Sequence, residues 1–398
     1  MLNISNPNKA QSNAKKSLAF LEFAFRPFFL FASLFSIISL VIWLGELTGR
    51  LNLNLYGGSL WWHIHEMLFA FVATVIAGFL LTAVQNWSGM RTLHGNLLGA
   101  LVILWLSARV ALFFPEELAH SLIMTLDIAF LPISAIALAL PIIKAKLWRN
   151  LIFVPILFVM AATNTAMHFS AMTADPLLMS KASTFMVLLI TLVMCVMGGR
   201  VFPMFTANGT KTPRVNALPF LEKLSIASIL CVVIFGSGFI ELPASVVGGL
   251  FIVTAIIHGV RVFRWNFLVT LKTPLVWSLH ISYWCIAIGL LMFGLSEVSS
   301  IVSHSQAIHT LTVGAMANMI LAMISRVSLG HTGRMIVVGK TMTIAFLAII
   351  SASFFRVFGL YFIDNYSHIL SLSVIFWVIG FGCFTVLYLP ILLKPKAS

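Results

Sequence analysis

The stretch WWHIHEMLFAFVATVIAGFLLTAV, residues 61–84, decides the fold class of this chain. Its last 18 residues carry no ionisable side chain, and about 20 apolar residues are enough for a helix to span the hydrocarbon core of a bilayer. Runs of the same kind recur along the whole length. We predict twelve transmembrane helices, at residues 28–47, 61–84, 97–114, 120–143, 150–171, 183–205, 217–238, 243–264, 274–295, 305–325, 341–363 and 367–393.

The composition also favours a lipid environment over water. Of the 398 residues, 60% are hydrophobic and 9% are charged, whereas a soluble domain has about a quarter charged residues. Helices satisfy their own backbone hydrogen bonds in lipid, and the alternating segments of a membrane β-barrel are absent from the sequence. We therefore predict an all-α polytopic membrane protein. Residues 1–23 are predicted to be a polar cytoplasmic tail that does not resemble a signal peptide, and residues 24–398 a single transmembrane domain.

The charges predict the orientation of the chain. Twenty of the 24 Lys and Arg residues fall on the side of the predicted N-terminus, and nine of the 11 Asp and Glu residues fall on the opposite side. This is the positive-inside pattern, so both termini are predicted to be cytoplasmic. The formal net charge of +13 thus reflects topology. The expected partner is the lipid bilayer, and no nucleic-acid partner is expected.

Several classes of function lack their usual sequence markers. The four cysteines lie one to a predicted helix, without a CxxC pair, so no disulfide framework is predicted. The sequence also lacks a Walker A motif, a GxGxxG fingerprint, a GxSxG elbow, an HExxH motif and a CxxCH site for covalent haem. This argues against ATP-driven transport, hydrolase chemistry and c-type haem.

Eleven histidines are the main indication of function, because ionisable residues in a membrane tend to face a protein interior or a cavity. The densest group is His63, His65 and Glu66, at the outer start of the second predicted helix. Positions two apart point about 200° away from each other on a helix. One histidine is therefore predicted to be a metal ligand and the other a supporting or entrance group. The alternative is a structural role at the interface, since the neighbouring tryptophans commonly anchor helix ends.

His309 lies about five residues into the tenth predicted helix, at nearly the depth of His65 on the second. Two imidazoles at one level on two helices suit axial ligation of a haem or part of a copper site, so we assign His65 and His309 as axial or metal ligands. His63 and Glu66 receive the catalytic role, His63 as ligand or proton relay and Glu66 as proton acceptor or orienting group. Met316 shares the helical face of His309, and its thioether would suit copper(I), with filler packing as the alternative.

A second group of polar residues is predicted near the inner face. His258 and His280 lie about 9 Å deep on adjacent antiparallel helices and could face one another across a cofactor. His331 and Arg334 follow in a glycine-punctuated loop, with Arg326 just before it. Arginines pair bidentately with carboxylates such as haem propionates. We therefore predict an inner cofactor or metal site, with backbone-bonded histidines and positive-inside arginines as the alternatives.

Other polar residues inside the predicted helices are single-residue signals. Asp127 lies on the fourth helix, and Asn164 and His168 share one face of the fifth. They favour interhelical hydrogen bonding, with a proton-delivery route as the second interpretation. Arg109 and Arg356 lie near outer helix ends and are predicted to snorkel.

Seven short motifs in a particular order carry a family resemblance. They are FRPFF at 25–29, WHIHEM at 62–67, AGFLLTA at 77–83, NW at 86–87, GRVFPMFT at 199–206, AIHTLTVG at 307–314 and LGHTGR at 329–334. With these motifs the chain resembles the NnrS family of bacterial membrane proteins, which are associated with haem, copper and nitric-oxide stress. The resemblance implies b-type haem, copper as a second metal, a bacterial inner (cytoplasmic) membrane and a role in nitric oxide metabolism or resistance. It adds weight to His63, His65, His309 and His331, which lie in matching motifs.

The leading hypothesis is a haem-binding inner-membrane protein that handles nitric oxide. It would either reduce nitric oxide at a metal, as a nitric oxide reductase-like oxidoreductase with an unknown electron donor, or protect other iron centres from it. Nitric oxide reductases also place outer haem ligands on the second and tenth of twelve helices, which is an analogy of architecture alone. One alternative is a transporter for a metal complex or a small nitrogen-oxide or nitrosylated species, with a helix interrupted between Gly198 and Pro203. Another is a gas or redox sensor without turnover.

Overall fold

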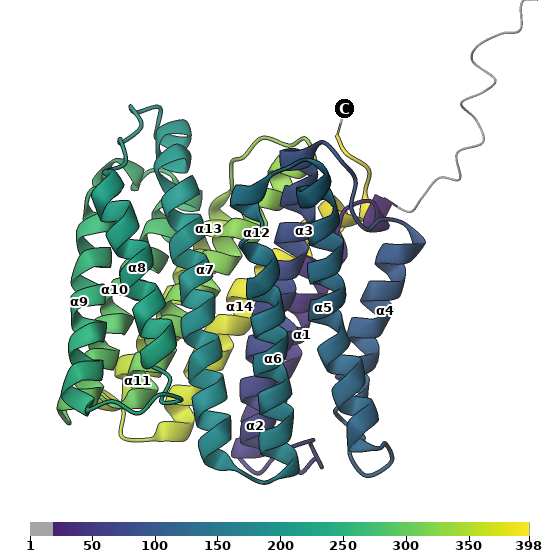
Figure 1. Cartoon of the computed structure of the whole chain (residues 1–398), viewed down its shortest axis with the longest axis vertical. Coiled ribbons are helices and arrows are strands. Elements are labelled where there is room, and N and C mark those ends of the chain that lie inside the picture. Colours follow the sequence, from purple (N-terminus) through teal and green to yellow (C-terminus); the bar gives the residue numbers. More distant parts are fainter. Residues whose placement is uncertain (1–18, 398) are drawn as a thin grey trace, which may run out of the picture.

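Residues 19–397, which the structure describes, form helices and no β-strand (Figure 1). The structure is a computed structural model, and it confirms the all-α prediction. The main elements are α1 (Phe25–Leu47), α2 (Ser59–His65), η3 (Glu66–Ala73), α3 (Thr74–Ser88), α4 (Asn96–Ala111), α5 (His120–Lys144), α6 (Phe153–Met172), α7 (Pro176–Thr210), α8 (Pro219–Phe235), α9 (Ala244–Phe263), α10 (Pro274–Val298), α11 (His304–His309), η6 (Thr310–Ala317), α12 (Asn318–His331), α13 (Lys340–Phe358) and α14 (Tyr366–Leu393). Four short 3-10 segments complete them, η2 (Ala19–Leu21), η4 (Trp148–Asn150), η5 (Phe267–Thr270) and η7 (Gly359–Tyr361).

Ten stretches of the described chain are long and apolar enough to cross a membrane, and each coincides with a predicted span. The other two predicted spans correspond to α4 and α8, which have 16 and 17 residues. At 1.5 Å per residue these two helices are about 24–26 Å long, slightly short of a hydrocarbon core. The polytopic membrane fold is therefore established, whereas the count of twelve stays a prediction.

The outward faces of the helices are as apolar as the core. On α9, Val253, Ile256 and Val260 point outward and are at least half exposed, while Phe251 and His258 are buried in the bundle. A helix at a water interface would carry charged or polar residues on its outer face. The outer surface of α9 is thus suited to contact with lipid.

The two ends of the described chain meet at one end of the bundle (Figure 1). Arg26 at the start of α1 is fully buried, and its Nη1 donates to the backbone oxygens of Leu392 at 2.9 Å and Lys394 at 2.5 Å. The backbone N–H of Ala397 donates to the carbonyl of Thr332 at 2.9 Å. Since both ends lie on the same side, the number of membrane crossings between them is even.

Two helices change their winding at one point each. The second span passes from α2 through the π-helical segment η3 into α3, and η3 begins directly after His65. The tenth predicted span passes from α11 through the π-helical segment η6 into α12, and η6 begins directly after His309. π-Helical segments are rare and often occur at functional sites. Both of them follow a histidine of the predicted outer site.

The predicted interruption between Gly198 and Pro203 is wrong, because α7 runs continuously across it. A glycine is nevertheless needed at 199: a Cβ there would collide with the guanidinium of Arg261. That guanidinium donates from Nη1 to the backbone oxygen of Cys195 at 2.9 Å. Packing by Arg261 from α9 thus supports the helix where glycine and proline would otherwise weaken it.

Candidate functional site

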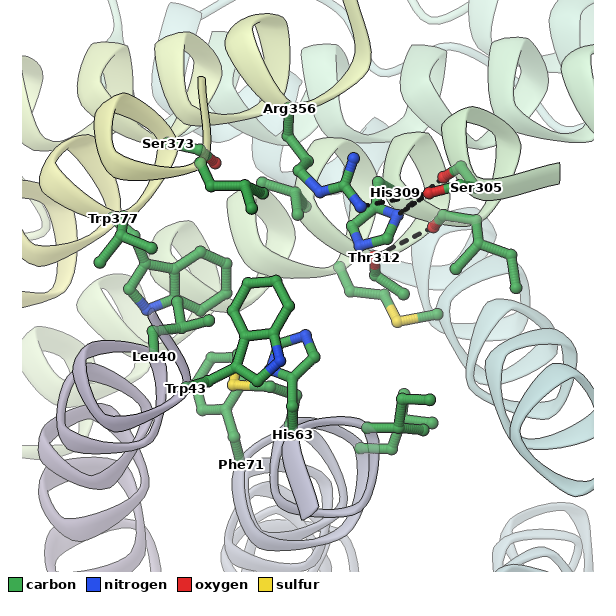
Figure 2. Close-up of a pocket in the computed structure, with 18 of the residues that line it drawn as sticks. Leu40, Trp43, His63, Phe71, Ser305, His309, Thr312, Arg356, Ser373 and Trp377 are labelled. Atoms are coloured by element: carbon green, nitrogen blue, oxygen red, sulfur yellow. Dashed lines mark hydrogen bonds between the residues drawn. The ribbon is translucent and has the colours of Figure 1, made fainter. Parts of the chain in front are cut away.

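A cavity of about 410 Å³ lies between α1, α2, η3, α7, α11, η6, α13 and α14, near the end of the bundle that is predicted to be the outer one. Its walls are mostly apolar and aromatic, with Trp43, Phe71 and Trp377 among them. Two imidazoles, of His63 and His309, project into it from different helices, as Figure 2 shows. The volume falls within the range of small-molecule and cofactor sites, about 300–1,000 Å³.

His63 is held by stacking. Its ring lies parallel to the indole of Trp43, with centroids 4.1 Å apart and an angle of 18° between the planes. The Nδ1 atom of His63 is buried and has no hydrogen-bond partner among the described residues. A buried polar atom without a partner costs about 1–3 kcal/mol. The imidazole of His63 is therefore suited to bind something that enters the cavity.

His309 is held by a hydrogen bond that fixes its tautomer. Its Nδ1 lies 2.7 Å from the backbone oxygen of Ser305, one turn earlier on α11. Because a carbonyl only accepts, Nδ1 carries the proton, and Nε2 of the neutral ring keeps its lone pair. This backbone contact is typical of metal-binding histidines. Arg356 of α13 lines the same cavity and donates from Nη2 to the Ser305 hydroxyl at 3.1 Å, which leaves a cation beside His309.

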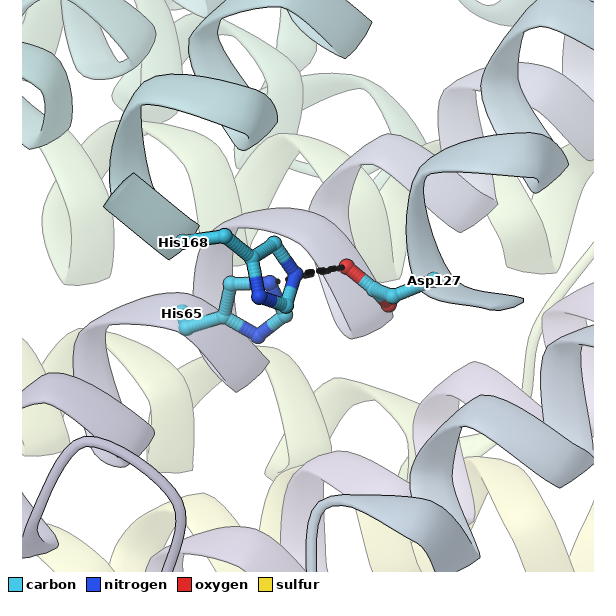
Figure 3. Close-up of side chains that lie close together, drawn as sticks. All are labelled: His65, Asp127 and His168. Carbon is cyan, nitrogen blue, oxygen red and sulfur yellow. Dashed lines mark hydrogen bonds and ion pairs between the residues drawn. The ribbon is translucent and has the colours of Figure 1, made fainter. Parts of the chain in front are cut away.

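The other face of α2 carries a second polar cluster, centred on His65. Its Nδ1 lies 2.8 Å from Oε1 of Glu66. Its Nε2 lies 3.0 Å from Oδ2 of Asp127 on α5 and 2.8 Å from Oδ1 of Asn164 on α6. The imidazole of His168, also on α6, reaches the same Asp127 oxygen with its Nε2 at 3.1 Å (Figure 3).

Two further residues surround this cluster. Arg109 of α4 donates from Nη1 to Glu66 at 2.6 Å, and its Nη2 forms an ion pair with Oδ1 of Asp127. Tyr56, in the loop before α2, has its hydroxyl 3.3 Å from Nδ1 of His168. Burial raises the pKa of Tyr56 to about 12, so its hydroxyl stays protonated at neutral pH.

The structure does not bring His65 and His309 together, although they were predicted as a ligand pair. His63 shares the cavity with His309 instead, and His65 faces α5 and α6. The physical reason is the angular offset of about 200° between positions two apart on a helix. Depth alone made His65 and His309 look like partners, and the helix faces separate them. Glu66 lies with His65 in the polar cluster, outside the cavity.

The predicted inner pair is also separated. His258 has its Nδ1 2.8 Å from the hydroxyl of Tyr283 and its Nε2 3.2 Å from the backbone oxygen of Ser225. His280 has its Nε2 2.8 Å from the hydroxyl of Thr206 on α7. Both rings are fully buried and hydrogen-bonded within the protein, and no hydrogen bond joins them in the part of the chain that the structure describes. The contacts of His258 resemble those of a structural histidine, whereas Nδ1 of His280 is buried without a hydrogen-bond partner among the described residues.

The three remaining predicted residues of the inner site lie in different surroundings. His331, at the end of α12, has its ring 5.6 Å from that of Phe25 on α1. Arg326 is buried, with its guanidinium 3.9 Å from the ring centroid of Phe205. Arg334 donates to the backbone oxygen of Thr332 at 3.3 Å. Within residues 19–397, no hydrogen bond or ring contact joins these side chains to His258 or His280.

For several residues of the cavity and the polar cluster, the role predicted from the sequence differs from the contacts in the structure. Arg109 and Arg356 were predicted to snorkel, but Arg109 pairs with two carboxylates and Arg356 lines the cavity. Asp127, Asn164 and His168 do form interhelical hydrogen bonds, and Oδ2 of Asp127 is the atom that His65, Asn164 and His168 all contact. The available signal was their common depth: each lies within about three turns of an outer helix end, as His65 does.

The cavity and the polar cluster offer different donor sets. The cavity has one imidazole from each of two helices, aromatic walls and one guanidinium, which fits a flat apolar ligand that carries a metal and an anionic group. The polar cluster has His65, Asp127 and His168, whose donor atoms all lie within 4.8 Å of one another, and is the one such group of three found among the described residues.

Comparisons with known proteins support the motif resemblance. The family model described as "NnrS protein" matches residues 19–396, nearly the whole chain. No curated protein sequence matches it. A match of this extent, together with a fold of ten apolar helices long enough to cross a membrane, establishes the family. The chain belongs to the NnrS family of membrane proteins associated with nitric oxide.

Proposed function

We propose that the outer cavity binds b-type haem and that the protein handles nitric oxide there, in the bacterial inner membrane. The observation that carries the proposal is the pair of imidazoles, His63 and His309, that open into one apolar cavity from two helices. His309 directly precedes the π-helical segment η6, and His63 lies one turn before the π-helical segment η3. Haem proteins hold their iron with axial histidines between apolar walls, and this cavity offers both.

The two histidines would have different roles. His309 is the fixed ligand, because the backbone oxygen of Ser305 orients its ring and directs the Nε2 lone pair away from α11. His63 is the exchangeable ligand or proton donor, because stacking on Trp43 restrains its plane while no hydrogen bond holds its Nδ1. Arg356 would pair with a propionate at the cavity edge. A haem iron in this place would supply the coordination position that binds nitric oxide.

The surroundings of the cavity suit a small apolar gas. A smaller cavity of about 80 Å³ adjoins it and shares Val72 and Met316 with it. Its lining is entirely apolar and includes the thioethers of Met194, Met197 and Met319. Nitric oxide is soluble in such surroundings, so it can reach the cavity through the apolar interior without a water channel.

Copper is the second metal that the proposal includes. The imidazole pair of His63 and His309 suits copper as well as haem iron, so metal analysis is part of the test. The protein could reduce nitric oxide with electrons from a donor, or bind it and so protect other iron centres. A measurement of nitric oxide turnover distinguishes the two. Loss of nitric oxide in the presence of a reductant indicates a reductase, whereas binding without loss indicates protection or sensing.

The test follows the optical spectrum of the reduced, detergent-purified protein while nitric oxide is added. The wild type should show a haem spectrum that shifts on addition, and His309→Ala should show neither. His304→Ala is the matched control, because His304 lies on the same short helix but packs against Phe293 at 4.6 Å and does not line the cavity. A nitric-oxide response that is equal in His309→Ala and His304→Ala would contradict the proposal.

A further inference from the structure

The imidazole of His65 is surrounded by hydrogen-bond acceptors. Its Nδ1 faces a carboxylate oxygen of Glu66 at 2.8 Å, and an ionised carboxylate can only accept. Its Nε2 faces Oδ2 of Asp127 at 3.0 Å and Oδ1 of Asn164 at 2.8 Å. The amide orientation of Asn164 is fixed, since its Nδ2 donates to the same Asp127 oxygen at 2.5 Å. With the proton on Nδ1, the Nε2 lone pair therefore points at two oxygen lone pairs, and a cation between them would relieve the repulsion.

The donor atoms converge as they do in a metal site. Nε2 of His65 and Nε2 of His168 lie 3.0 and 3.1 Å from one oxygen of Asp127. Donors about 2.1 Å from a transition metal are separated by about 3.0–3.4 Å in octahedral or tetrahedral geometry. All three side chains are almost completely buried. The cluster therefore differs from the exposed acidic groups on protein surfaces, which commonly hold no metal.

The groups behind these donors also match a metal site. His65 directs its Nδ1 to Glu66, which gives the carboxylate–histidine arrangement that orients metal-binding imidazoles. His168 directs its Nδ1 to the Tyr56 hydroxyl at 3.3 Å. Arg109 pairs with the other oxygen, Oδ1, of Asp127, so that Oδ2 is the oxygen that faces the two imidazoles.

The charges of the cluster leave room for a cation. Glu66 and Asp127 contribute two negative charges, and Arg109 contributes one positive charge. One negative charge remains if both imidazoles are neutral. Burial of an uncompensated charge is strongly unfavourable in a membrane protein, so a bound cation would stabilise the cluster.

We propose that His65, Asp127 and His168 bind one divalent first-row transition metal ion, with Asn164 as a further oxygen donor. The site is separate from the haem proposal, because it lies on the opposite face of α2 and shares no residue with the cavity. Two imidazole nitrogens with one carboxylate oxygen favour zinc, iron(II), cobalt(II), nickel(II) or copper(II) over magnesium and calcium, which prefer oxygen donors alone.

The test uses the full-length protein in detergent, treated with chelator and then titrated with Co²⁺, whose visible absorption reports binding to nitrogen and oxygen donors. The wild type should bind one equivalent. His168→Gln and Asp127→Asn should bind at least about 100-fold more weakly, since even changes to groups behind the ligands cost about 10–100-fold. His120→Gln is the matched control, because His120 lies beside the same Tyr56 ring, at 5.2 Å, but outside the cluster.

Two further measurements keep the result independent of folding defects and of haem. Copper(II)-loaded His309→Ala, whose cavity has lost one of its two imidazoles, should show hyperfine splitting from two imidazole nitrogens in its electron paramagnetic resonance spectrum. The same variant should bind Co²⁺ as the wild type does. Absence of a saturable site in the wild type, equal affinity in His168→Gln and His120→Gln, or a copper spectrum without imidazole nitrogens would overturn the proposal. Loss of Co²⁺ binding in His309→Ala alone would assign the metal to the cavity instead.

Discussion

Arg109 shows how one residue determines whether a buried polar cluster is tolerated in this fold. Arg109 is 5% exposed, and its guanidinium pairs with both Glu66 and Asp127. Buried ion pairs are weak evidence of net stabilisation, yet removal of one partner leaves the other charges uncompensated. At Arg109 one substitution would leave two carboxylates without their cation.

Arg109→Met is therefore expected to destabilise the protein by about 3–5 kcal/mol. The measurement is thermal unfolding of the detergent-purified protein, followed by circular dichroism. Arg91→Met is the control, because Arg91 is exposed in the loop between α3 and α4 and should change stability by less than about 0.5 kcal/mol. If the two variants have the same melting temperature, Arg109 is not the cation that compensates Glu66 and Asp127.

At the scale of the helical element, the two π-helical segments are the main departures from regular structure. Each π turn inserts one extra residue relative to an α-helix, so residues on either side no longer follow a single 3.6-residue wheel. In the structure Met316 of η6 still lines the cavity with His309, but Met319 and Met323 of α12 line only the smaller one. Met316 of η6 thus lies where the two cavities adjoin.

The position of η6 depends on close contact with α10. A Cβ at Gly289 would lie 2.7 Å from Leu311 Cδ2 and 3.2 Å from the Leu311 backbone nitrogen, so a side chain there must displace η6. A Cβ added to Gly249 on α9 would have no atom within 4 Å. Gly249 offers a control in which glycine is replaced in a helix without a collision.

Gly289→Ala is expected to lower stability by about 1–3 kcal/mol through overpacking and to reduce haem retention, because η6 begins directly after His309. Gly249→Ala should lose neither, since alanine favours a helix by up to about 1 kcal/mol over glycine. Melting temperature and absorbance at the haem band, measured on both proteins, check this. Equal haem content and stability in the two variants would show that the packing of η6 against α10 does not position the cavity.

For the molecule as a whole, the open point is whether α4 and α8 cross the membrane. The even number of crossings and the charge pattern predict that the loop before α8 is cytoplasmic and that the loop after it is outside. Asn216 and Glu241 are exposed residues of these two loops. The side of the membrane on which each of these two positions is accessible shows whether α8 crosses the membrane.

With the four native cysteines replaced by alanine, Glu241→Cys should react with a membrane-impermeant maleimide in intact cells. Asn216→Cys should react only after the cells are permeabilised, because a crossing helix separates the two positions. A mass-shifted band on a gel reads out the reaction. Labelling of both positions from the same side would mean that α8 does not span the membrane, and the twelve-helix count would then fail.

Much of the fold could be predicted because insertion into lipid depends on local sequence. A run of about 20 apolar residues identifies a span without knowledge of its neighbours, and the opposite directions of His63 and His65 follow from helix geometry alone. The partners of these histidines could not be predicted in this way. Asp127 is 62 residues from His65, and no periodicity indicates which helix faces which.

The histidine pairing failed for a related reason. Depth along a helix can be counted from sequence, but the direction of a side chain around the bundle depends on packing, and π-helical winding changes it further. For Arg356, hydropathy gives the same signal whether the side chain reaches out to the interface or turns into a cavity, as it does beside His309. Only the assembled bundle distinguishes the two.

The most direct test of the central claim is the haem content of the purified protein, measured as the pyridine haemochrome, in the wild type, His309→Ala, His63→Ala and His304→Ala. The account predicts b-type haem in the wild type and in His304→Ala, its loss in His309→Ala, and a changed coordination spectrum in His63→Ala. Full haem content with an unchanged spectrum in His309→Ala, or a wild type without haem, would contradict the assignment of the cavity.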